Sequence, residues 1–210
     1  MSTHALPLLD AGSAETGLGN RGPQSKSIIV PYGFWLFILS DIILFSALFA
    51  SYAALVHSTD GGPTGRELFD LRNVAIETVS LLASSFVCGL ALIAANRRNM
   101  LWTQVWLLLT GLLGFVFLLI ELREFGSMIM AGAGPQRSAF LSAFFTLVGC
   151  HGAHITAGLL WIGTLMAQVW AKGFRPHIMR GFLCFTLFWH ALDIVWVAIF
   201  TIVYLMGMAP

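Results

Sequence analysis

The chain has 210 residues, of which 58% are hydrophobic and 10% are charged, and its mean hydropathy is +0.83. Soluble domains carry about 25% charged residues, so this composition excludes an ordinary water-soluble protein and indicates that most of the surface faces lipid. The formal net charge of +1 provides no basic surface for a nucleic-acid partner. The three cysteines form no CxxC pair, so we expect neither a disulfide framework nor a zinc site.

The N-terminal segment, Met1 to Ser27, is polar and rich in Gly, Ser and Pro. It lacks the apolar core of a cleaved signal peptide. We therefore expect residues 1–30 to form a flexible polar tail on the starting side of the membrane. Residues 31–210 are expected to form one membrane domain.

Five later segments are long and apolar enough to cross a bilayer, which takes about 20 residues. They predict an all-α integral membrane protein built as a bundle of five transmembrane helices. The fourth segment exceeds a perpendicular crossing, so it is expected to tilt or protrude. Asn96-Arg97-Arg98-Asn99, Gly61-Gly62-Pro63-Thr64-Gly65 and Gly132-Ala133-Gly134-Pro135 separate the segments as turns. The five segments are Tyr32 to Val56, Val74 to Ala95, Leu101 to Ile120, Phe140 to Trp170 and Gly181 to Met206.

Five crossings place the two termini on opposite sides of the membrane, and the basic residues divide unequally between these sides. The N-terminal side carries seven Lys and Arg residues and the other side carries four. Because cytoplasmic loops carry the excess of Lys and Arg, we expect the N-terminus to be cytoplasmic and the C-terminus periplasmic. The seven are Arg21, Lys26, Arg97, Arg98, Lys172, Arg175 and Arg180, and the four are Arg66, Arg72, Arg123 and Arg137.

Small residues and tryptophans mark where helices should meet. Gly149, Gly152 and Gly158 in the fourth segment allow close helix approach, so we expect this helix to be central. Trp102 and Trp170 lie near segment ends and suit a membrane interface. The tryptophans deeper in the segments are expected to pack between helices or against lipid chains, and these are Trp161, Trp189 and Trp196.

Eight ionisable residues lie inside or at the ends of these apolar segments, where charge is costly and side chains usually face the protein interior or a water cavity. Two pairs are spaced i, i+3, so each pair shares one helix face. We expect these faces to point inward and to form hydrogen bonds with neighbouring helices. The eight residues are Asp41, Glu77, Glu121, Glu124, His151, His154, His190 and Asp193.

These residues allow several interpretations. A b-type haem would need two axial ligands at matching depth, and His151 and His190 are the pair that could meet. Two histidines and one aspartate could coordinate zinc. A proton relay or proton-coupled transporter needs titratable groups across the whole membrane, and one half offers only Asp41 and His190. We favour a structural polar network that locks the bundle.

Several motifs, taken in order, make the sequence specific. From about Gly33 to Gly207 the chain resembles subunit III of the haem-copper oxidases, and within that family the branch of the cytochrome bo-type ubiquinol oxidases. Asp41 stands where the cytochrome c oxidases usually carry Glu, and five spans replace the seven that many of those subunits have. The motifs are Gly33 to Asp41, Gly61 to Gly65, Glu77-Thr78 with Ser84-Ser85, Glu121 to Glu124, Gly134 to Ser138 leading to His151-Gly152-Ala153-His154 and Gly158, and Trp189 to Trp196.

The resemblance implies an accessory subunit of a bacterial inner-membrane terminal oxidase, with no catalytic residue, cofactor or metal of its own. Haem and copper would belong to subunit I, which this chain would flank in a complex with subunits II and IV. Such a complex oxidises ubiquinol, reduces O2 to water and translocates protons. In this family the third subunit binds phospholipids, supports the durability of the oxidase, and has been linked to oxygen or proton delivery. A small proton-coupled transporter and a b-haem subunit are the alternative functions.

Overall fold

The structure is a computed structural model that describes residues 26–61 and 71–205. Within these ranges five helices are long and apolar enough to cross a membrane, which confirms the expected all-α bundle. The tail before residue 26, the turn residues Gly62 to Gly65 and Met206 lie outside the described residues. The helices are α1 (Lys26–Leu55), α3 (Leu71–Asn96), α4 (Met100–Met130), α5 (Ala139–Lys172) and α6 (Pro176–Ile199), and the π-helix η1 (Phe200–Leu205) continues α6.

Local capping explains where several helices begin. The Asn99 side chain accepts a hydrogen bond from the Trp102 backbone N–H at 3.3 Å, and the Ser138 hydroxyl accepts one from the Leu141 N–H at 3.2 Å. Both bonds satisfy an N–H group that the first turn of a helix leaves open. Pro176 occupies the first turn of α6, where a missing N–H costs nothing. The predicted starts lie one residue from the observed ones for α4 and α5, whereas α6 begins five residues earlier than the predicted Gly181.

The length of α4 differs from the prediction. The sequence suggested an end near Ile120, because two glutamates and an arginine interrupt the apolar pattern there. The helix instead continues to Met130, and Glu121 and Glu124 turn inward with 2% and 8% exposure. Arg123 faces outward between them. A charged residue therefore ends an apolar run without ending a helix, since the helix can rotate its carboxylates into the protein.

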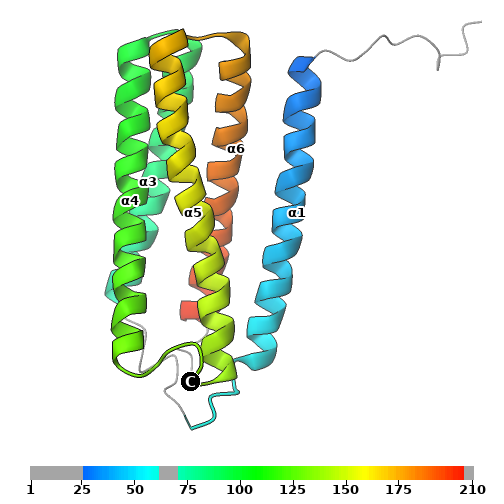
Figure 1. Cartoon of the computed structure of the whole chain (residues 1–210), viewed down its shortest axis with the longest axis vertical. Coiled ribbons are helices and arrows are strands. Elements are labelled where there is room, and N and C mark those ends of the chain that lie inside the picture. The colour runs from blue at the N-terminus through cyan, green and yellow to red at the C-terminus, as the bar shows by residue number, and fades with distance from the viewer. Residues whose placement is uncertain (1–25, 62–70, 206–210) are drawn as a thin grey trace, which may run out of the picture.

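The helices are unequally buried, and α1 is the outlying one. Helix α3 packs on α4 and α6, while α5 packs on α4, α6 and α1, which confirms its central position. Helix α1 stands at the edge of the bundle against α5 and α6 (Figure 1). Only 11% of the 18-residue apolar stretch of α1 is buried within the subunit, compared with 56% of the corresponding stretch of the last span. Most of α1 therefore presents its side chains away from the rest of the subunit.

Trp189 of α6 fills a notch between two glycines on different helices. A Cβ atom at Gly158 of α5 would lie 2.6 Å from the indole ring, and one at Gly114 of α4 would lie 2.9 Å from it. The indole N–H donates a hydrogen bond to the Ser84 hydroxyl of α3 at 3.0 Å. One side chain thus joins four helices, and at these two glycines the free space holds an aromatic ring.

Trp196 repeats this contact two turns later on α6. Its indole N–H donates to the Thr78 hydroxyl of α3 at 3.1 Å, and its ring meets the edge of Phe117 at a centroid distance of 4.6 Å. Trp189 and Trp196 are 1% and 0% exposed, which confirms that these deep tryptophans pack between helices. Trp102 and Trp170, by contrast, are exposed near helix ends.

We predict that Gly158→Ala destabilises the subunit, because its methyl group has no room beside Trp189. Overpacking of this kind typically costs about 1–3 kcal/mol. Thermal unfolding in detergent, followed by circular dichroism, measures the effect. Gly163→Ala on the same helix is the matched control, since nothing lies within 4 Å of a Cβ there. Equal melting temperatures for the two variants would contradict this packing.

Candidate functional site

The eight candidate residues separate into distinct groups in the structure. Asp41 and His154 meet between α1 and α5. The carboxylates of Glu77, Glu121 and Glu124 converge between α3 and α4. The other three residues lie apart from both groups: His190 lines a groove, Asp193 lies one turn beyond it on α6, and His151 is in the aromatic core.

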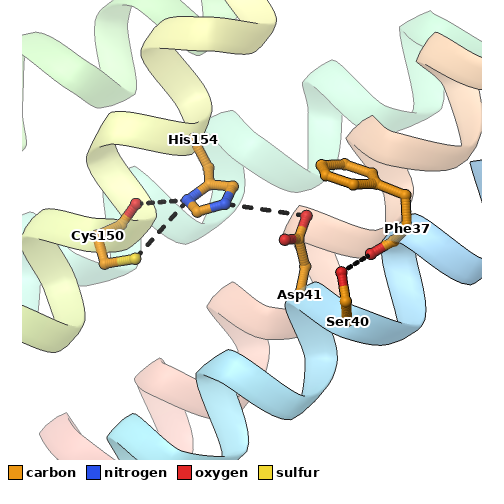
Figure 2. A network of polar contacts seen from close by, with 5 residues as sticks. All are labelled: Phe37, Ser40, Asp41, Cys150 and His154. Atoms are coloured by element: carbon orange, nitrogen blue, oxygen red, sulfur yellow. Dashed lines mark hydrogen bonds and ion pairs between the residues drawn. The ribbon is translucent and has the colours of Figure 1, made fainter.

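The contact between Asp41 and His154 is the one candidate pair that links α1 to the bundle (Figure 2). The Nε2 atom of His154 lies 3.9 Å from Oδ2 of Asp41, and the two side chains are 21% and 20% exposed. The Nδ1 atom of His154 lies 2.8 Å from the backbone carbonyl oxygen of Cys150, one turn earlier on α5. The imidazole is therefore fixed to α5 through Nδ1 and faces Asp41 of α1 through Nε2.

This geometry determines where the imidazole carries hydrogen. A carbonyl oxygen can only accept, so Nδ1 of His154 must donate to the Cys150 oxygen. Nε2 then faces the Asp41 carboxylate at 3.9 Å, a distance longer than a hydrogen bond. The two side chains therefore form a close polar approach between α5 and α1.

A groove runs beside this pair between α1 and α6. It has a volume of about 470 Å³ and is lined almost wholly by apolar side chains. A smaller pocket containing Asp41 shares Ile38, Ile42 and Phe45 with it. The α1 side includes Trp35, Ile38, Ile42, Phe45 and Phe49, and the α6 side includes Leu187, His190, Ala191, Ile194, Val195 and Ala198.

His151 has a different environment from His154, although the two are only three residues apart. It is 0% exposed and stacks on Trp196 at a centroid distance of 5.3 Å. Phe117 packs on it edge-on at 5.7 Å. Among the described residues, neither ring nitrogen has a hydrogen-bond partner, so the expected interhelical hydrogen bond is not found at His151. His151 therefore packs within the aromatic core.

His190 and Asp193 share a face of α6, as their spacing predicts. His190 lines the groove, while Asp193 is partly buried and near enough to His190 and to Ser85 of α3 to interact with both. His190 therefore lies at the groove while His151 is enclosed by aromatic rings. This separation does not suit two axial ligands of one haem.

The sequence did not identify the acceptors that the structure uses. The hydroxyls of Ser84 and Thr78 receive the two buried indole N–H groups, and the Cys150 carbonyl fixes His154. The sequence does show Thr78 and Ser84 as two polar residues six positions apart in an apolar segment. It does not show which tryptophans of another helix reach their hydroxyls.

Comparison with known proteins decides the family. A model described as cytochrome c oxidase subunit III matches residues 13–208. The chain belongs to this family. It is therefore a subunit III of the haem-copper oxidases and a multi-pass membrane protein, with five helices of spanning length among the residues that the structure describes.

Three relatives show the range of names within the family. The cytochrome bo(3) ubiquinol oxidase subunit 3 of Pseudomonas aeruginosa is 46% identical over 207 residues, which cover 99% of each chain. The quinol oxidase subunit 3 of Bacillus subtilis is 42% identical over 84% of this chain and 86% of that one. The cytochrome c oxidase subunit 3 of Bacillus sp. strain PS3 is 44% identical over 84% of this chain and 85% of its own. Sequence identity thus establishes that the chain is a third subunit. It does not decide between quinol and cytochrome c as the electron donor of the oxidase, because relatives of both kinds are 42–46% identical.

We predict that Asp41 and His154 are energetically coupled, because their polar atoms lie 3.9 Å apart and both side chains are about one-fifth exposed. In a double-mutant cycle of Asp41→Asn and His154→Gln, the double variant should be destabilised by less than the sum of the single variants. Coupling of about 0.5–1 kcal/mol is expected for a partly exposed contact. Thermal unfolding in detergent gives the four free energies.

Ser51→Ala is the control for this cycle, since its exposed hydroxyl bonds only within α1, to the Ala47 carbonyl. It should be additive with His154→Gln. Strict additivity of the Asp41 and His154 substitutions would show that the contact does not stabilise the protein.

Proposed function

We propose that the chain is an accessory, non-redox subunit of a terminal ubiquinol oxidase in a bacterial inner membrane. It flanks and stabilises the catalytic subunit I, which carries the haem and copper, in a complex with subunits II and IV. The complex oxidises ubiquinol, reduces O2 to water and translocates protons. The ubiquinol oxidase relative that aligns over 99% of both chains supports this donor.

The donor atoms of the chain support a role without a redox centre. Among the described residues, three or more His, Cys, Asp or Glu side chains come close enough to share one ion at a single place, which is formed by Glu77, Glu121 and Glu124. Carboxylate oxygens are hard ligands, whereas haem iron and copper are held by imidazole, thioether or thiolate. His151 is stacked and edge-packed by aromatic rings, which leaves no open coordination position. These features also weigh against the b-haem alternative.

The groove between α1 and α6 is the observation that carries the proposal, and its occupant is a phospholipid chain. Along α1 it extends from Trp35 to Phe49, which is about 21 Å at 1.5 Å per residue. The hydrocarbon layer of one leaflet is about 15 Å thick, so an acyl chain fits along the length of the groove. A void among apolar side chains would forfeit dispersion contacts on one side. The bound chain restores those contacts and completes the joint between α1 and the bundle.

The headgroup of this lipid lies at the start of α6. Arg175 and Arg180 stand at this end, about two to three turns before Leu187, where the groove begins on α6. Basic side chains at a membrane surface attract anionic lipid. The Asp41–His154 pair lies at the level of the acyl chain and serves as a polar contact between helices, outside the catalytic proton path.

The orientation follows from the distribution of charge. The N-terminal ends of α1 and α6 lie at the same end of the bundle (Figure 1). The turn between α3 and α4 carries Arg97 and Arg98. The excess of Lys and Arg makes this end cytoplasmic.

A cysteine at Asn96 or Gly173 should therefore resist a membrane-impermeant maleimide added to intact cells, and one at Gly132 should react. The reverse labelling pattern would invert the subunit.

We predict that Ala191→Phe removes one phospholipid per subunit from the purified oxidase. The added ring occupies the groove between α1 and α6, where Ala191 lines the wall. Lipid extraction followed by quantitative mass spectrometry counts phospholipids per complex. Ala167→Phe on the exposed face of α5 is the matched control and should retain the wild-type number.

A normal phospholipid count in Ala191→Phe, with the subunit assembled, would show that the groove holds no lipid. Equal losses in Ala191→Phe and Ala167→Phe would place the lipid elsewhere on the subunit. Loss confined to Ala191→Phe, together with a normal haem spectrum, supports both the lipid site and the non-redox role.

A further inference from the structure

Three carboxylates from two helices converge at one point inside the bundle. Glu77 of α3 and Glu121 and Glu124 of α4 each place one oxygen within 4.8 Å of the other two. The three residues are 0%, 2% and 8% exposed, respectively. A surface cluster of acids would be solvated and need no explanation. This cluster is enclosed by protein, so bulk water does not solvate it.

Glu77 and Glu121 lie close to each other without forming a hydrogen bond. Among the described residues, none of the four carboxylate oxygens of Glu77 and Glu121 has a hydrogen-bond partner. Acids that share protons directly would form short oxygen–oxygen hydrogen bonds. Glu77 and Glu121 instead point their unpartnered oxygens at a common space. An unpaired buried polar group is unfavourable, and two such carboxyl groups aimed at one space indicate a ligand between them.

A fourth polar group reaches the same place from a third element. Tyr204 is 0% exposed and lies near enough to Glu77, Glu121 and Glu124 to interact electrostatically with all three. It belongs to the π-helix η1, a rare geometry that frequently occurs at functional sites. Tyr204 thus adds a phenol from a third element to the buried polar groups near the carboxylates.

We propose that Glu77, Glu121 and Glu124 bind one hard divalent cation, with Ca²⁺ the best match. Carboxylate oxygens bind Ca²⁺ at about 2.3–2.6 Å, so two ligands of one ion lie at most about 5 Å apart. Every pair in this cluster meets that limit. An all-oxygen set does not favour zinc or copper, and Mg²⁺ usually keeps several water ligands, whereas this site is enclosed by protein.

The position of the cluster gives the ion a structural role. Glu77 lies six residues after the start of α3, and Glu124 lies six residues before the end of α4. At the other end a tight turn of three residues already joins the two helices. The cation therefore clamps α3 and α4 at their open ends, about two turns inside the bundle, and holds α6 beside them through Tyr204. This site is independent of the lipid groove.

Radioactive Ca²⁺ tests the proposal on the detergent-purified oxidase after chelator treatment. Equilibrium binding is compared among the wild type, Glu77→Gln and Glu121→Gln, with Asp41→Asn as a control carboxylate outside the cluster. The wild type and Asp41→Asn should each bind one more Ca²⁺ per complex than either glutamine variant, or bind it at least about tenfold more tightly. Added Ca²⁺ should also raise the melting temperature of the wild-type subunit.

Equal Ca²⁺ binding by the wild type and both glutamine variants would overturn the proposal. So would a wild type whose melting temperature is insensitive to Ca²⁺ and to EDTA, a measurement that needs no variant to fold. If the carboxyl groups are only protonated, the glutamine variants should match the wild type in stability and Ca²⁺ should have no effect, which also overturns it. Glu124→Asp keeps the charge and should retain weakened binding if the glutamine variants fail to assemble.

Discussion

A bilayer interior supplies no water, so a buried polar group of this subunit is stabilised when it finds a partner within the protein. The two indole N–H groups of α6 find such partners by donating to Ser84 and Thr78 of α3. The hydrogen bonds fix the rotation and height of α6, because each tryptophan reaches one acceptor. Trp189 also needs the space that glycine leaves at Gly114 and Gly158. The packing of four helices thus depends on one ring in one notch.

Helix α1 is less buried and is attached by a different set of contacts. It lacks a glycine notch and meets the bundle through side chains, including Phe34 on Trp161 and Phe45 on His154. At its far end the Tyr52 hydroxyl donates to the Val203 carbonyl at 3.5 Å. Between these contacts lies the apolar groove, beside the Asp41–His154 pair. A peripheral helix with a lipid-sized groove suits a subunit whose contribution is to protect a neighbouring catalytic subunit.

The sequence predicted the spans and the central position of α5, because the length of an apolar segment and its content of small residues can be seen within a single helix. It also predicted that Trp189 and Trp196 pack between helices. It missed the end of α4, since the inward rotation of Glu121 and Glu124 depends on what faces them. Spacing placed His151 and His154 on one face, but an i, i+3 pair is rotated by about 60° around the helix. That angle turns His154 towards α1 and His151 towards Trp196, so spacing alone could not assign their partners.

The central claim is that this subunit stabilises an oxidase whose redox chemistry lies elsewhere. The most direct measurement compares the purified oxidase with and without this chain, recording the visible haem spectrum and ubiquinol oxidation over repeated turnovers. The account predicts an unchanged haem spectrum, comparable initial turnover and faster loss of activity when the chain is absent. Loss of a haem signal from an otherwise intact complex would contradict it, because a haem would then depend on this chain for its ligands.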